Sequence, residues 1–90
     1  MVSHMQIKIR DIEDPEEVKL LEDIQRRVWG GEEIVVPAHI MIAAKEVGGI
    51  LKGAYIDNEL VGYVYGFLGR YKGRLCMYSH QLAVLKKYQN

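Results

Sequence analysis

The chain has 90 residues, and its 12 lysine and arginine residues balance its 12 aspartate and glutamate residues, for a formal net charge of zero. This length allows one small domain, and no apolar stretch is long enough to span a membrane. Balanced charge argues against a nucleic-acid-binding protein, which normally carries a basic excess. The charge is unevenly distributed, however, because residues 46–90 hold six basic and three acidic residues. This imbalance would suit a polyphosphate ligand, but chance explains it equally well.

The N-terminal residues and the single cysteine bear on the domain boundary and on the cellular compartment. Residues 1–4 precede a second methionine, Met5, and read as a cloning scar, so the predicted single domain covers residues 5–90. Cys76 is the only cysteine, which excludes an intramolecular disulfide and favours a reducing compartment, the cytoplasm. The three histidines and Cys76 have no metal-ligand spacing, so no metal site is predicted.

Residues 6–12 alternate between apolar and charged side chains. Ile7 and Ile9 fall on one side and Lys8 and Arg10 on the other, which is typical of a half-buried strand. We expect the two isoleucines to face the core.

A first helix is predicted to begin at Pro15. Asp14 can cap it, proline fits the first helical position, and Glu17 completes a capping box. Gly30-Gly31 ends it. Its apolar stripe, with the three- and four-residue steps of a helix, consists of Val18, Leu21, Ile24 and Val28.

A second helix is predicted from Pro37 to Val47, after a loop or short extended segment over residues 32–36. Gly48-Gly49 ends this helix. The apolar stripe expected to face the core comprises Ile40, Ala43, Ala44 and Val47.

Residues 50–56 and 60–68 read as a hairpin joined by the polar turn Asp57-Asn58-Glu59. Gly62 and Gly66 lie four residues apart on one side of the second strand, where a neighbour can approach closely; packing is the preferred explanation over a ligand. Residues 69–74 are predicted to form a basic loop that returns the chain to the sheet.

The last predicted strand covers residues 75–85. Apolar side chains occur on both of its faces, which indicates a buried strand. They surround one polar segment, Tyr78 to Gln81, and we expect function to lie in that segment.

The predicted order is therefore strand, helix, helix, strand, strand, strand. The hairpin sequence at residues 57–63, the strand end Leu82-Ala83-Val84 and the following Gln89-Asn90 resemble the N-terminal half of a GNAT superfamily N-acetyltransferase. In that family a loop of the form Gln/Arg-x-x-Gly-x-Gly/Ala follows, and Gln89-Asn90 match its first two positions. The resemblance implies an α+β fold in which two helices pack on a mainly antiparallel four-stranded sheet.

The resemblance also implies acetyl-CoA as the cofactor. In the family, main-chain groups of the central strand bind the pantetheine and polarise the thioester carbonyl; by position these belong to Leu82, Ala83 and Val84. Gln89 and Asn90 would begin the cradle for the pyrophosphate. The resemblance places three residues near the amine acceptor, which would be a small molecule or a protein: Trp29, His39 and Met41. Packing explains these residues as well.

Acetyl transfer to an amine needs a base that keeps the amine neutral and a donor for the oxyanion. The candidates for the base are His80, Tyr78 and Ser79; histidine is the only one of these residue types that titrates near neutral pH when unperturbed. A structural, hydrogen-bonded histidine is the equal alternative. In a regular strand His80 would share a face with Leu82, whereas a bulge would change that assignment.

Two functional classes follow. In the first, the chain is part of an acetyl-CoA-dependent N-acetyltransferase, cut before the phosphate loop and inactive as given, with weak or absent cofactor binding. In the second, it is a structural module that forms a homodimer or higher assembly along residues 75–85, because the strand would be an apolar edge. An unrelated small α+β ligand-binding domain is the third interpretation.

Overall fold

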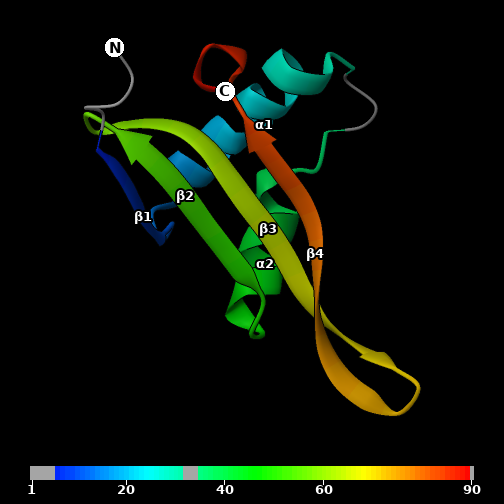
Figure 1. Cartoon of the computed structure of the whole chain (residues 1–90). Helices are drawn as coiled ribbons and strands as arrows, with labels where there is room; N and C mark the ends of the chain where they lie inside the picture. The colour runs from blue at the N-terminus through cyan, green and yellow to red at the C-terminus, as the bar shows by residue number, and fades with distance from the viewer. Residues whose placement is uncertain (1–5, 32–34, 90) are drawn as a thin grey trace.

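The computed structural model describes residues 6–31 and 35–89 and has the predicted α+β class and element order (Figure 1). Its strands form one antiparallel sheet in the order β1-β2-β3-β4, so β1 and β4 are its edges. The predicted scar at residues 1–4 lies outside the described residues. The elements are β1 (Ile7–Asp11), α1 (Pro15–Trp29), α2 (Ala38–Glu46), β2 (Ile50–Ile56), β3 (Glu59–Tyr71), β4 (Arg74–Val84) and a 3-10 turn, η2 (Lys86–Tyr88).

Helix α1 begins and ends as the sequence predicts, but the capping box is wrong. The Asp14 carboxylate accepts a hydrogen bond of 2.9 Å from the Glu16 N–H. Gly30, at φ 84°, donates its N–H to the Arg26 carbonyl and ends the helix in the left-handed conformation that glycine favours. The Glu17 carboxylate points to the sheet, where it accepts hydrogen bonds from two side chains.

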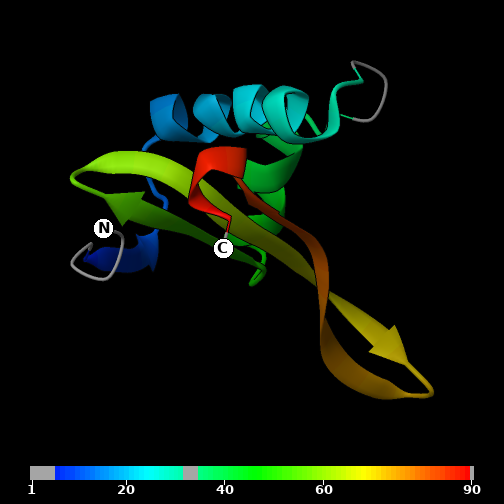
Figure 2. The ribbon, with the colours of Figure 1, turned by 45° about the horizontal axis from the view of Figure 1, so that its top comes forward.

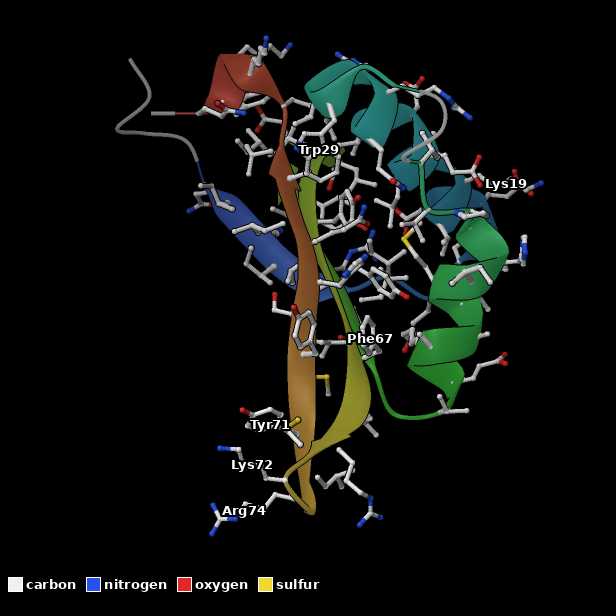
Figure 3. The ribbon with its side chains drawn as sticks, turned by 90° about the vertical axis from the view of Figure 1, so that its right-hand side faces the viewer. Lys19, Trp29, Phe67, Tyr71, Lys72 and Arg74 are labelled. Carbon is white, nitrogen blue, oxygen red and sulfur yellow. The ribbon has the colours of Figure 1, made fainter. Side chains whose placement is uncertain are left out.

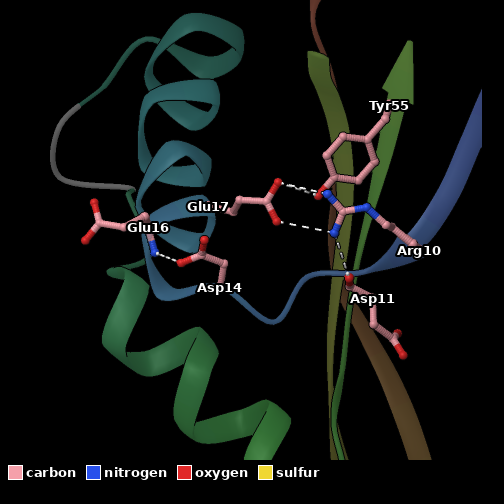
Figure 4. Close-up of polar contacts among 6 residues, drawn as sticks. All are labelled: Arg10, Asp11, Asp14, Glu16, Glu17 and Tyr55. Carbon is pink, nitrogen blue, oxygen red and sulfur yellow. Dashed lines mark hydrogen bonds and ion pairs between the residues drawn. The ribbon is translucent and has the colours of Figure 1, made fainter. Parts of the chain in front are cut away.

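Those two donors tie β1 and β2 to α1 (Figure 4). Both Arg10 guanidinium NH2 groups donate to Glu17, at 3.3 and 3.1 Å, and the Tyr55 hydroxyl donates to it at 3.2 Å. The Arg10 guanidinium also lies 4.0 Å from the centre of the Tyr55 ring, a cation–π contact. One carboxylate thus holds the first turn of α1 against the sheet.

Both helices cover the same face of the sheet and leave the other face uncovered (Figure 2). Arg10 lies opposite Gly53 and points toward α1, so Ile7 and Ile9 point to the uncovered face, where Ile9 is 62% exposed. The expectation that these isoleucines face the core is wrong. The ion pair and cation–π contact of Arg10 decide the orientation of this edge strand.

Helix α2 also presents a different face to the core from the one predicted. Pro37 is its N-cap and not its first residue. Ala38 and Met41 are buried, whereas Ile40 is 45% exposed and Val47 is exposed too, so the predicted stripe is wrong. Since all of these residues are apolar or small, periodicity alone could not choose between the two faces.

Two tight turns shape the second half of the chain. Asp57 and Asn58 have positive φ and join β2 to β3 in two residues. Lys72 and Gly73, at φ 51° and 77°, join β3 to β4 in the same way. The predicted basic loop at residues 69–74 is therefore wrong: β3 and β4 continue through it as a long hairpin.

The orientation of α2 gives a test with a matched pair of variants. Met41→Ala should lower the free energy of unfolding by about 2–5 kcal/mol, because Met41 is fully buried in the core. Ile40→Ala, on the same helix, should change it by less than about 0.5 kcal/mol. Urea denaturation followed by circular dichroism measures both; a larger loss for Ile40→Ala would contradict the observed orientation.

Candidate functional site

The polar segment of β4 contains a β-bulge. Tyr65 lies opposite Gln81 and Gly66 lies opposite Ser79, so His80 is the extra residue on β4. The His80 ring packs 5.8 Å from Tyr65, measured between ring centres, on the face covered by the helices. The structure therefore has the alternative in which a bulge changes the assignment, and His80 does not share a face with Leu82.

His80 belongs to a cluster of aromatic rings. Its ring meets that of Tyr65 edge-on, at 88°, and lies 5.5 Å from Phe67. Tyr78 stacks on Phe67 at 5.5 Å with an angle of 16° between the rings. Ser79 pairs with Gly66 and lies on the uncovered face. The structure therefore brings Tyr78 and His80 together and places Ser79 apart from them.

The orientation of His80 suits an acid–base role. The residue is exposed, so a substrate can reach its imidazole. Two neighbouring rings, those of Tyr65 and Phe67, limit the directions in which it can point. An accessible imidazole of fixed orientation is able to accept a proton from an amine held beside β4.

A buried series of hydrogen bonds, the buried chain, passes through Gln81, the residue after the bulge. The Tyr63 hydroxyl donates to the Gln81 side-chain oxygen at 3.0 Å, and the Gln81 amide donates to Gln25 Oε1 at 3.2 Å. Gln25 is 0% exposed, donates to the Val36 carbonyl at 3.0 Å and accepts from the Val36 N–H at 2.6 Å. This chain joins β3, β4, α1 and the segment before α2.

The main chain of β4 is free on its outer edge just after the bulge. The Leu85 N–H donates to the Val61 carbonyl, which fixes the alternation of the antiparallel ladder. The main-chain groups of Ala83 consequently face β3, and those of Leu82 and Val84 face outward. The Val84 carbonyl accepts a hydrogen bond of 2.7 Å from the Gln89 side chain. Of the three predicted thioester-binding residues, two are placed to offer main-chain groups.

Gly62 and Gly66 are required by the close approach of β4. A Cβ atom at Gly62 would lie 2.8 Å from the Ala83 carbonyl oxygen, and one at Gly66 would lie 2.8 Å from that of Tyr78. Both distances are too short for any side chain. The packing explanation predicted for these glycines is the one observed, and the neighbour is the strand that carries the bulge.

The three residues predicted near the acceptor do not form one site. Met41 is fully buried in the core, as its packing alternative expects, while Trp29 and His39 are exposed. His39 lines a hollow of about 310 Å³ between α1 and α2, together with Lys19 and Glu22. Gln89 is bound to Val84, and Asn90 lies outside the described residues.

Of the residues in these buried hydrogen bonds, Gln81 lies in the predicted polar segment, whereas Gln25 and Tyr63 were not predicted. Gln25 follows Leu21 by four residues and so interrupts the apolar stripe of α1 with an amide. A polar residue at a stripe position is a usable signal, because a buried amide needs hydrogen-bond partners. Tyr63 gave no comparable signal, since tyrosine is common in strands.

Comparison with protein-family models, with curated proteins and with solved structures finds no match to this chain. Within residues 6–31 and 35–89, no group of three or more histidine, cysteine, aspartate or glutamate side chains could hold a metal ion. In the same ranges, neither helix has the length and apolar character needed to cross a membrane. The site must therefore be interpreted from its own geometry.

The buried Tyr63 predicts a pH dependence of stability. Burial raises the pKa of its phenol well above the usual value, so the unfolded chain ionises first, from about pH 10. The contribution of the neutral phenol is complete below that pH and is lost as pH rises toward the folded pKa. Tyr63→Phe should cost about 0.5–1.5 kcal/mol at pH 7 through the lost hydrogen bond, and this cost should shrink above pH 10.

Urea denaturation of both proteins between pH 7 and pH 11 measures this difference. Tyr71→Phe is the control, because Tyr71 is exposed and its substitution should leave the pH dependence unchanged. A cost of Tyr63→Phe that stays constant, or grows, above pH 10 would contradict the assignment.

Proposed function

We propose that the chain is the cofactor-binding part of an acetyl-CoA-dependent N-acetyltransferase. The enzyme would act in the cytoplasm on a small-molecule or protein amine. One observation carries the proposal: a bulge at His80 lies directly before main-chain groups of Leu82 and Val84 that point away from the sheet. An exposed imidazole and outward-facing main-chain groups, of which the Val84 carbonyl is bound by Gln89, are thereby adjacent on one strand. The element order supports the same family.

The proposed chemistry uses these groups in two roles. The Leu82 N–H donates to the thioester carbonyl oxygen and stabilises the oxyanion that forms when the amine attacks. His80, directly or through water, accepts the proton that the amine must lose, and Tyr78 lies in the same aromatic cluster. The tetrahedral intermediate then expels the CoA thiolate. No covalent bond to the protein forms.

Further proposed contacts involve the residues after β4 and the exposed side chains near the helices. Gln89 would release the Val84 carbonyl, which it now binds, so that pantetheine can pair with the strand and Gln89 with Asn90 can meet the pyrophosphate. Trp29 and His39, both exposed, are the remaining candidates for the acceptor side. We expect cofactor binding by these 90 residues to be weak and turnover to be absent.

A titration of the ¹⁵N-labelled chain with acetyl-CoA tests this proposal. We expect the largest amide shifts at Leu82, Ala83 and Val84, with saturation only at millimolar cofactor. Pantetheine alone should shift the same amides, because the strand binds that part of the molecule. Shifts confined to lysine- and arginine-rich segments, equally produced by a nucleotide without pantetheine, would contradict the proposal, as would no shift at all.

The same free edge supports a second function, self-association. Leu75, Met77 and Leu82 are exposed on β4, and Leu82 is 70% exposed. Edge strands with apolar side chains tend to pair with another chain. We therefore propose, as the alternative, a homodimer joined along residues 75–85.

Leu82→Pro tests this homodimer, because it should prevent dimerisation without unfolding the protein. The Leu82 N–H faces away from β3, so proline there should leave the β3–β4 ladder intact and remove the donor that a partner strand needs. Sedimentation should show a wild-type dimer and a folded Leu82→Pro monomer at high micromolar concentration. Ala83→Pro, which removes an inward N–H, should unfold the chain. A wild-type monomer, or a dimer unaffected by Leu82→Pro, would contradict pairing along this edge.

A further inference from the structure

The end of the β3–β4 hairpin, residues 67–78, projects from the rest of the molecule; we call it the arm (Figures 1 and 2). The pairing of β2 with β3 stops at Ile50 and Gly66, while β3 and β4 pair on to Tyr71 and Arg74. Beyond Gly66 the arm is therefore a ribbon of two strands without a third. Its tip is the tight turn at Lys72.

The arm is a concentrated site of positive charge. Arg70, Lys72 and Arg74 lie within five residues at its tip, all exposed, and no aspartate or glutamate follows Glu59 in the sequence. In the described part of the chain, the acidic partners of the ion pairs lie before β2, and none of the three arm cations forms an ion pair. Unpaired cations at a protruding tip are free to meet an anionic partner.

The three cations are distributed over the turn and both faces of the ribbon, and Figure 3 shows Lys72 and Arg74 at its tip. Arg70 lies opposite Leu75 on the uncovered face, Arg74 lies opposite Tyr71 on the other face, and Lys72 is in the turn. Tyr71 is 67% exposed, and the Lys72 ammonium lies 5.3 Å from the centre of its ring. A protein that docks on one face would meet only part of this charge. A groove with an anionic wall on each side would meet all of it.

We propose that the arm binds double-stranded DNA, with the ribbon in the major groove and Arg70, Lys72 and Arg74 on the phosphates. The major groove of B-form DNA, about 12 Å wide, admits a two-stranded β-ribbon, whereas the major groove of duplex RNA is too narrow for side chains to read. The net charge of zero does not oppose this, because residues 67–78 of the arm contain no aspartate or glutamate. The contacts are to the backbone, so binding is not sequence-specific.

Fluorescence anisotropy with a labelled 20-base-pair DNA duplex of mixed sequence tests this inference. Three phosphate contacts give a slope of log affinity against log salt of about −2.7, which is about a 40-fold loss of affinity between 50 and 200 mM salt. The triple variant Arg70→Gln, Lys72→Gln, Arg74→Gln should lose at least about tenfold in affinity at 50 mM salt and most of this slope. Circular dichroism checks that the variant is folded.

A second triple variant serves as a control of equal charge. Lys8→Gln, Lys19→Gln, Lys86→Gln removes three exposed cations away from the arm and should retain wild-type binding within about twofold if the arm supplies the contacts. Equal losses in the two variants, or no binding to DNA at 50 mM salt, would overturn the inference. So would equal or tighter binding to duplex RNA, or equally effective competition by polyglutamate, since either shows that the groove is not what is recognised.

Discussion

The fully buried side chain of Gln25 joins the separate parts of this fold. Its amide binds both main-chain groups of Val36 and accepts from Gln81, so α1, the segment before α2 and β4 meet at one group. An amide left without partners in the core would cost about 1–3 kcal/mol for each lost hydrogen bond. That cost makes the relative positions of α1 and β4 specific. A shift of either element by one residue would break the series of hydrogen bonds from Gln25 through Gln81 to Tyr63.

With both helices on one face, the sheet has two different surfaces. The covered face holds the core and the buried hydrogen bonds. The uncovered face carries Ile7, Ile9 and Leu82, all exposed. Ile9 and Leu82, with Ala54 and Val64, line a small apolar hollow of about 100 Å³. Exposed apolar surface of this kind favours aggregation in water. At the edge of the sheet, the cations of the arm and the bulge of β4 are features that oppose nonspecific pairing with other strands.

The sequence was sufficient for the element types, their order and most of their boundaries. Those predictions rested on strong local signals, such as Asp14 and Pro15 at the start of α1 and the turn at Asp57. The faces were harder to predict. β1 is inverted because Arg10 finds both Glu17 and Tyr55, residues 7 and 45 positions further along the chain, and an alternating pattern carries no information about such partners.

The candidate site was predicted in location but not in arrangement. The polar segment of the last strand was found because polar residues stood out in an apolar strand. The placement of both His80 and Gln81 on the covered face depends on the bulge, whose position a period of two does not give. The basic tip was likewise taken for a loop, since Gly69 and Gly73 are turn residues in most contexts; Gly73 does form the turn, while Gly69 continues the strand.

The bulge links the buried hydrogen bonds to the exposed imidazole of His80. In a regular strand, His80 and Gln81 would point to opposite faces; with the bulge, both reach the covered face, Gln81 toward Gln25 and His80 toward Tyr65. Gly66 supports this geometry, because any side chain there would push against the carbonyl of Tyr78, two residues before His80. The position of the imidazole therefore depends on the same bulge that lets Gln81 reach Gln25 on α1.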